Sequence, residues 1–299
     1  MSFVKKAIKR IRKSRLKRVL QKIHKLPEIN AARLKVALAP QRPSFLGPEE
    51  LKLLQARYPV RNSYKYDDQS KLDRGLERAR RILELPGAES ATSFLEVGCG
   101  DGMTAAMLHR LGKSSTGIDL GEHKFDPRAF EEGAILLGMN AERLSFEDSS
   151  FDYVVSFNSF EHFSQPARVL DEMIRVLRPG GYIYLDFGPL CHAPFGEHAY
   201  RTITVPYCQF LFTLDTMNQY AEEHGLKPID PEHVNRWSLE DYRELWESRK
   251  EVLNPVFYKE IYHLSHLDLL KKYPSCFKGK VHSFENYLVS KIQAVFKFK

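Results

Sequence analysis

The chain has 299 residues, 43% of them hydrophobic and 28% charged, with a formal net charge of +7. This length and apolar content suffice for one large core, and without a run of about eighteen apolar residues we expect no transmembrane helix. The N-terminus lacks an apolar stretch followed by a small-residue cleavage site, so we expect no secretory signal.

The positive charge is concentrated at the N-terminus. Residues 1–25 contain eleven Lys and Arg side chains and no acidic ones, which leaves 34 basic and 38 acidic side chains in the mildly acidic remainder. A core of that charge argues against a nucleic acid as partner.

Residues 3–26 predict a basic amphipathic helix that ends at Pro27, because their apolar side chains fall near one stripe. Such a helix is typical of peripheral contact with an anionic membrane. A helix packed on the body, a solvated basic arm, a nucleic-acid arm and an organelle transit peptide are the alternatives.

Further helices are expected before the core, at residues 48–57 and 72–85, with an aromatic and polar segment at 58–70. The first core strand, at 93–97, ends in three glycines at alternate positions, Gly98, Gly100 and Gly102. A helix follows at 102–112. Glycine lets a turn adopt positive φ and lets a ligand lie against bare main chain, and the helix N-terminus adds free N–H groups.

A second strand at 115–118 presents Asp119 at its end, where a carboxylate can accept the hydroxyl groups of a ribose. Strands at 134–138, 152–157 and 181–187 then alternate with helices at 126–134 and 165–177. This alternation predicts an α/β fold with a parallel sheet covered by helices on both faces. Beyond strand five we expect helices at 215–225 and 238–250, a strand at 254–263, and an antiparallel last strand within 285–297.

The glycine turn E-V-G-C-G-D-G with Asp119 does not fit the dinucleotide pattern G-x-G-x-x-G. It closely resembles the first motif of class I S-adenosylmethionine-dependent methyltransferases. Four further segments resemble later motifs of that family, in the same order: 140–146, 150–156, Glu161-His162 and 175–183. One departure is Asn140, which stands where the family usually has an acid.

The resemblance implies a Rossmann-like, doubly wound, seven-stranded and mostly parallel sheet, with a helical N-terminal extension and a substrate-covering insertion after strand five. It implies S-adenosyl-L-methionine as the cofactor. The residues that it places at the cofactor are Glu96, Gly98, Cys99, Gly100, Gly102, Asp119, Leu120, Asn140, Ala141 and Asn158. Tyr64, Tyr66 and Arg74 are candidates to cover its methionine end, or else ordinary packing residues. A scaffold without a nucleoside, or a non-catalytic copy, is the alternative.

Methyl transfer to a hydroxyl group requires a base, and histidine has a suitable pKa. His192 and His198 follow strand five and His162 follows strand four, so these three are the candidate catalytic residues, with structural roles as the alternative. We expect no metal, because no closely spaced set of ligands is present; Glu161, His162 and Glu197 are the residues considered.

The insertion contains H-A-P-F-G-E-H and V-P-Y-C-Q-F-L-F. It resembles bacterial methyltransferases associated with surface-polysaccharide synthesis. That resemblance favours O-methylation of a glycan, glycolipid or other hydroxylated metabolite by an enzyme in the cytoplasm, peripheral at the inner membrane face. A quinone, polyketide or amine acceptor, and a non-catalytic S-adenosylmethionine-binding protein, are the alternatives.

The predicted organisation has five parts. They are a basic helix at 1–26, a helical cap at 27–90, the cofactor-binding core at 91–190, the substrate-covering insertion and helix at 191–235, and the C-terminal helices and strands at 236–299. The four cysteines, Cys99, Cys191, Cys208 and Cys276, include no C-x-x-C pair and fit a reducing compartment.

Overall fold

The computed structural model describes residues 22–59 and 67–299. Most of the predicted basic helix at 3–26 therefore lies outside the described residues. Residues 22–38 form one continuous helix, so the prediction that Pro27 ends it is wrong. A proline within a helix removes one main-chain hydrogen-bond donor, which disfavours the helix. The helix nevertheless continues, because its buried side chains Ile29, Ala32 and Val36 pack against the rest of the protein.

Seven strands form one sheet in the order β3-β2-β1-β4-β5-β7-β6. The strands are Ser93–Val97 (β1), Ser114–Asp119 (β2), Ile135–Gly138 (β3), Phe151–Phe157 (β4), Leu177–Phe187 (β5), Leu253–Tyr262 (β6) and Val289–Phe298 (β7). The strands β1 to β5 pair in parallel, and β7 is antiparallel to both β5 and β6. The predicted doubly wound, mostly parallel sheet is confirmed. Its order reverses between β1 and β4, where ligands bind in such sheets, at the carboxyl ends of the strands.

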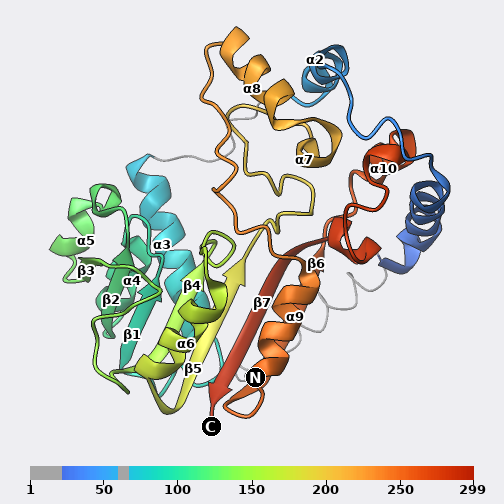
Figure 1. The fold of residues 1–299 in the computed structure, drawn as a ribbon. Helices are drawn as coiled ribbons and strands as arrows, with labels where there is room; N and C mark the ends of the chain where they lie inside the picture. The colour runs from blue at the N-terminus through green and yellow to red at the C-terminus, as the bar shows by residue number, and fades with distance from the viewer. Residues whose placement is uncertain (1–21, 60–66) are drawn as a thin grey trace.

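Helices cover both faces of this sheet (Figure 1). One face packs against α3 (Asp68–Leu83) and α4 (Met103–Arg110), and the other against α6 (Pro166–Val176) and α9 (Leu239–Ser248). Successive side chains of a strand point to opposite faces of the sheet, so neighbouring residues of β4 pack on different faces. Tyr153 contributes to the first face and Val154 to the second.

A separate core lies beyond the carboxyl ends of the parallel strands, in the upper part of Figure 1. It joins the helix at 22–38 to α2 (Pro48–Arg57), α7 (Cys208–Leu211), α8 (Leu214–Glu223) and α10 (Leu267–Lys272). Segments from the beginning and the end of the described chain thus share one apolar core.

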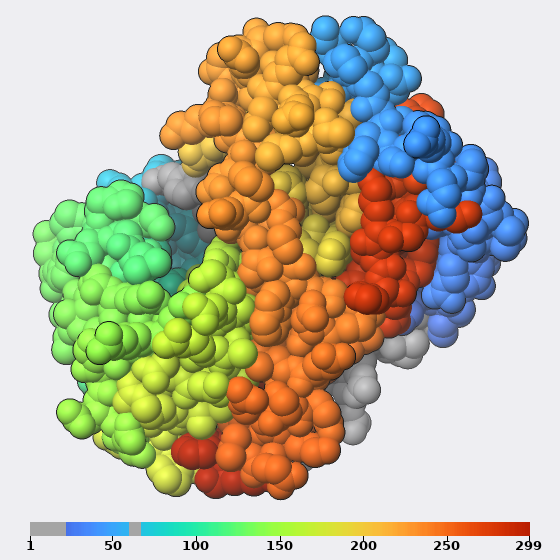
Figure 2. Space-filling model, in the orientation of Figure 1, coloured from blue at the N-terminus to red at the C-terminus, as the bar shows by residue number. Residues whose placement is uncertain are grey.

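The segment between β5 and α8, residues 188–213, crosses from the sheet into this core. In Figure 2 its yellow residues are partly covered between the orange and red segments of the chain. The shorter elements are α5 (Pro127–Glu131) and three 3₁₀ turns, Glu122–Lys124, Pro274–Cys276 and Phe284–Tyr287. Within residues 22–59 and 67–299, no helix has the length and apolar character needed to cross a bilayer.

Candidate active site

The glycine turn joins β1 to α4 with its main chain in the left-handed region. Gly100 has φ +59° and Gly102, the residue before α4, has φ +77°. A side chain on Gly102 would come within 2.5 Å of Leu136, whereas one on Gly100 would meet no atom within 4 Å. The main chain at Gly100 therefore borders open space, as a turn that receives a ligand requires.

Asp119 lies beside this turn at the end of β2. Its Oδ2 accepts a hydrogen bond from the Gly100 amide at 3.0 Å, and its Oδ1 accepts one from the Gly121 amide at 2.9 Å. Lys124 Nζ also lies 3.5 Å from Oδ1, so Oδ2 has a lone pair left for a ligand, whereas a ligand at Oδ1 would share that oxygen with Lys124. The next residue, Leu120, is largely exposed.

Glu96, at the end of β1, is a buried carboxyl group without a partner. Its side chain is 1% exposed, and its nearest polar groups, the Thr104 hydroxyl and the Ala105 main chain, do not reach ordinary hydrogen-bond geometry with either oxygen. Burial raises the pKa of Glu96 to about 8. Such a group is rare in a folded protein and favours a bound ammonium group or water as its partner.

The other residues expected at the cofactor differ in their surroundings. Cys99 is buried, and burial raises the pKa of its thiol, so it remains neutral at pH 7. Asn140 Oδ1 accepts from the Glu142 amide at 2.9 Å, and Ala141 is buried in the core. Arg74 donates to Asp101 of the turn at 2.7 Å. Tyr64 and Tyr66 lie outside the described residues.

A cavity of about 1400 Å³ opens beyond the ends of β4 and β5, and we call it the strand-end cavity. Asn158 and Glu161 line it after β4, and Gly188 and Pro189 line it after β5. The described lining includes no residue of the glycine turn, but the two regions are linked through Ser159, the residue after Asn158, whose hydroxyl donates to the Gly98 carbonyl at 2.9 Å. The remaining lining residues come from the segments 57–59, 195–204 and 227–233, and from His266.

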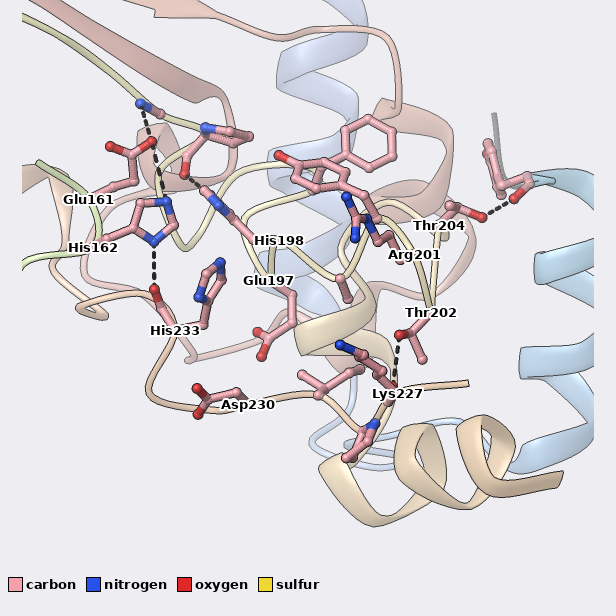
Figure 3. A pocket seen from close by; sticks show the side chains of 18 of the residues that line it. Glu161, His162, Glu197, His198, Arg201, Thr202, Thr204, Lys227, Asp230 and His233 are labelled. Carbon is pink, nitrogen blue, oxygen red and sulfur yellow. Dashed lines mark hydrogen bonds and ion pairs between the residues drawn. The ribbon is translucent and has the colours of Figure 1, made fainter. Parts of the chain in front are cut away.

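Three histidines meet inside the strand-end cavity: His162, His198 and His233 (Figure 3). We call them the histidine cluster. The ring centroid of His162 lies 4.8 Å from that of His198 and 4.6 Å from that of His233. Burial lowers the pKa of all three, that of His198 to about 4, so the imidazoles are neutral at pH 7.

Two main-chain carbonyls orient the imidazoles of the cluster. His162 Nδ1 donates to the His233 carbonyl at 2.6 Å, and His198 Nε2 donates to the Pro189 carbonyl at 2.8 Å. The opposite ring nitrogen of each neutral imidazole therefore carries a lone pair. His162 Nε2 and His198 Nδ1 are available to accept a proton or to bind a cation.

Two glutamates in the cavity differ in their surroundings. Glu197 accepts from both ends of the Arg236 guanidinium, at 2.6 and 2.8 Å. Glu161 Oε1 accepts from the Gly188 amide at 3.0 Å, but its Oε2 is buried and has no partner among the described residues. Burial raises the pKa of Glu161 to about 7.

The structure thus brings His162 and His198 together and separates His192 from them. His192 is not among the described residues that line the strand-end cavity. Its ring lies 6.0 Å from that of Phe210, and its Nδ1 lies 3.4 Å from Cys191 Sγ. Our sequence analysis missed His233, which lies in a loop without a motif or a regular spacing to the other two.

Comparison with known proteins finds a family whose sequence model matches part of the chain. The sequence model of a family described as "Methyltransferase domain" matches residues 95–185. An uncharacterized methyltransferase of Mycolicibacterium gilvum is 32% identical over 139 residues, covering 46% of this chain and 52% of the relative. A ubiquinone biosynthesis O-methyltransferase of Colwellia psychrerythraea is 25% identical over 180 residues, covering 51% of this chain and 70% of the relative.

The chain spans about half the length of several curated relatives that it matches. Among solved structures, the PH0226 protein of Pyrococcus horikoshii is 18% identical with a TM-score of 0.47, over 84% of this chain and 99% of that one.

Proposed function

We propose that this chain, which contains a class I S-adenosylmethionine-dependent methyltransferase domain, methylates a hydroxyl group of a glycan, glycolipid or other hydroxylated metabolite. The observation that carries the proposal is the strand-end cavity, which lies at the carboxyl ends of β4 and β5, is linked to the glycine turn through Ser159, and contains neutral imidazoles with free lone pairs.

S-adenosyl-L-methionine is the cofactor, and the described residues fit it. The main chain at Gly100 borders open space, and the Asp119 carboxylate beside it has lone pairs for the ribose hydroxyls. Glu96 offers an unpartnered buried carboxyl group where β1 meets the turn. When bound, the cofactor supplies a methyl group that its sulfonium has already activated.

The lining of the cavity supports a polar acceptor. Charged side chains line it from several directions, including those of Arg201, Lys227 and Asp230 (Figure 3), and Arg57 lines it as well. Aromatic rings at Tyr58, Phe195 and Tyr200 are interspersed with them. A cavity of about 1400 Å³ exceeds the range of about 300–1000 Å³ that is usual for small ligands. It has room for an acceptor with more than one sugar ring.

In the proposed reaction the chain aligns the acceptor hydroxyl with the cofactor and removes its proton. His198 Nδ1 and His162 Nε2 are the proton acceptors that the geometry favours, because both are neutral and carry a lone pair. General base catalysis of this kind contributes roughly 10²–10⁴-fold to the rate.

A quinone or other aromatic acceptor is the second candidate. The relative named as a ubiquinone biosynthesis O-methyltransferase supports it, as do the aromatic rings in the cavity. Incubation with methyl-labelled cofactor and separate panels of sugars, lipid-linked sugars and catechols, followed by mass spectrometry, distinguishes the two. Labelled sugar supports our proposal, labelled catechol supports the alternative, and cofactor binding without turnover on any panel supports a non-catalytic protein.

Our proposal includes peripheral membrane contact through the basic residues 1–26, on the cytoplasmic side. Each Lys or Arg near an anionic surface contributes about 1 kcal/mol. The comparison in a liposome pelleting assay is between the full chain and a chain lacking residues 1–21, since the helix at 22–38 belongs to the folded core. Equal pelleting of both with anionic liposomes would rule out this contact.

A further inference from the structure

We propose that His162, His198 and His233 bind a divalent transition-metal cation of the zinc class within the strand-end cavity, with Glu161 as the partner of a water bound to that cation. Of the residues that the structure describes, these histidines form a group whose possible ligand atoms all lie within 4.8 Å of one another. They come from three separate segments that the fold brings together (Figure 3).

His162 and His198 of the histidine cluster have the kind of tautomer that metal-binding histidines have. A histidine that binds a metal usually donates its other ring N–H to a carbonyl or carboxylate, which fixes the ring. His162 and His198 each donate one N–H to a main-chain carbonyl, so their lone pairs lie on His162 Nε2 and His198 Nδ1.

The buried carboxyl group of Glu161 is an independent observation that points to a cation. Glu161 is 2% exposed, and its Oε2 has no partner among the described residues. Its Oε1 lies 4.0 Å from His162 Nε2, the nitrogen that carries the lone pair. A buried carboxylate is costly without a positive partner. A divalent cation between these atoms would supply that partner.

The other charges around the cluster allow a cation there. Arg236 is the nearby cation that affects His198, and it is already paired with Glu197 through two hydrogen bonds. Asp230, near His233, adds a negative charge. Lys124 lies near both His162 and His233 and opposes a cation there, but its ammonium group also pairs with Asp119 at 3.5 Å.

The ligand set matches one type of site. Three neutral imidazoles with an open fourth position are typical of catalytic zinc, with Zn–N distances of about 2.0–2.1 Å. A tetrahedral site therefore needs nitrogens roughly 3.3 Å apart. The present spacing of up to 4.8 Å requires the rings to approach by about 1.5 Å or less. All three histidines lie outside regular helices and strands, where side chains can adjust most easily.

The metal site stands on its own geometry, and its consequence for catalysis rests on the proposed function. At its open fourth position, the cation would hold the oxygen of the acceptor hydroxyl and lower the pKa of that hydroxyl. The histidines would then act as ligands, and the hydroxyl proton would pass to Glu161 or to solvent.

The test measures metal binding by the full chain without cofactor or acceptor, so that it is independent of methyl transfer. Tag-free protein is titrated with Zn²⁺ in a calorimeter and, separately, dialysed against Zn²⁺ and analysed for metal content. Substitution with Co²⁺ adds a visible d–d spectrum that reports tetrahedral nitrogen ligands. We expect one cation per chain.

Three variants and one control assign the ligands. We expect His198→Ala and His233→Ala each to raise the Kd for Zn²⁺ by at least about a hundredfold, and Glu161→Gln to raise it about tenfold. The exposed His282 lies outside the cavity lining, so His282→Ala should leave the Kd unchanged. Circular dichroism checks that each variant is folded.

Wild-type chain that binds no stoichiometric Zn²⁺ would overturn the proposal, whatever the variants do. So would a Kd that does not change in the His198 and His233 variants. Metal binding without methyl transfer on any acceptor would leave this site standing and refute the proposed function. Methyl transfer by metal-free protein would support the function and overturn the catalytic consequence of the metal.

Discussion

Replacement of Asp119 by alanine should remove most of the affinity for the cofactor. The carboxylate is held by the amides of Gly100 and Gly121, at 3.0 and 2.9 Å, in a position beside the glycine turn. Hydrogen bonds to a charged group contribute about 1.5–3 kcal/mol each. Loss of two such bonds to ribose hydroxyls therefore costs at least about 3 kcal/mol, which corresponds to a roughly hundredfold rise in Kd.

Isothermal titration calorimetry with S-adenosylmethionine and with S-adenosylhomocysteine measures this change. Asp119→Asn keeps one carbonyl oxygen and should give an intermediate Kd. Asp171 provides a control, because it is an exposed acid on α6 that pairs with Arg249. Asp171→Ala should leave the Kd unchanged. If Asp119→Ala binds within about twofold of the wild type while remaining folded, the assignment of this carboxylate to the ribose is wrong.

Three further predictions concern the glycine turn, the strand-end cavity and Glu96. Gly102→Ala should lower the melting temperature more than Gly100→Ala, because only the Gly102 side chain would clash with its surroundings, whereas Gly100→Ala should weaken cofactor binding in calorimetry without such a clash. His198→Ala should lower turnover at least about a hundredfold, and His192→Ala less than about threefold, in a labelled-methyl assay; equal losses would contradict the placement of the base in the strand-end cavity. The folded-state pKa of Glu96, about 8, lies above the usual value near 4.3, so the folded chain binds more protons between these values and loses stability as pH rises from about 5 to about 8. Glu96→Gln should reduce this fall in melting temperature of the cofactor-free protein, and an unchanged pH profile would show that Glu96 is not buried as a neutral acid.

The central part of the fold could be predicted from the sequence because its signals are local. The apolar run of β1, the glycine turn and the start of α4 follow one another without interruption, and the structure has them at the predicted place. The predicted ends of some helices and strands differ from the observed ones by a few residues. The helix predicted at 126–134 ends at Glu131, since Gly133 has φ +87° and cannot continue it. The strand predicted at 181–187 begins earlier, because Leu177 pairs with Phe151.

The histidine cluster could not be predicted in full, because it depends on contacts between distant segments. His162 was found through its motif and His198 through its place after β5. His233 lies in the loop between α8 and α9, and only the folded chain brings its ring to the other two. The separation of His192 from them has the same origin. It lies six residues before His198, yet the intervening turn directs its ring toward Phe210.

The shared core of the helix at 22–38 and the segment around α10 has a consequence for biosynthesis. The helix at 22–38 is synthesised long before α10, but its apolar side chains have no complete partner surface until the residues of α10 have been made. Domains fold as units during translation, so we expect this helix to remain undocked for most of synthesis.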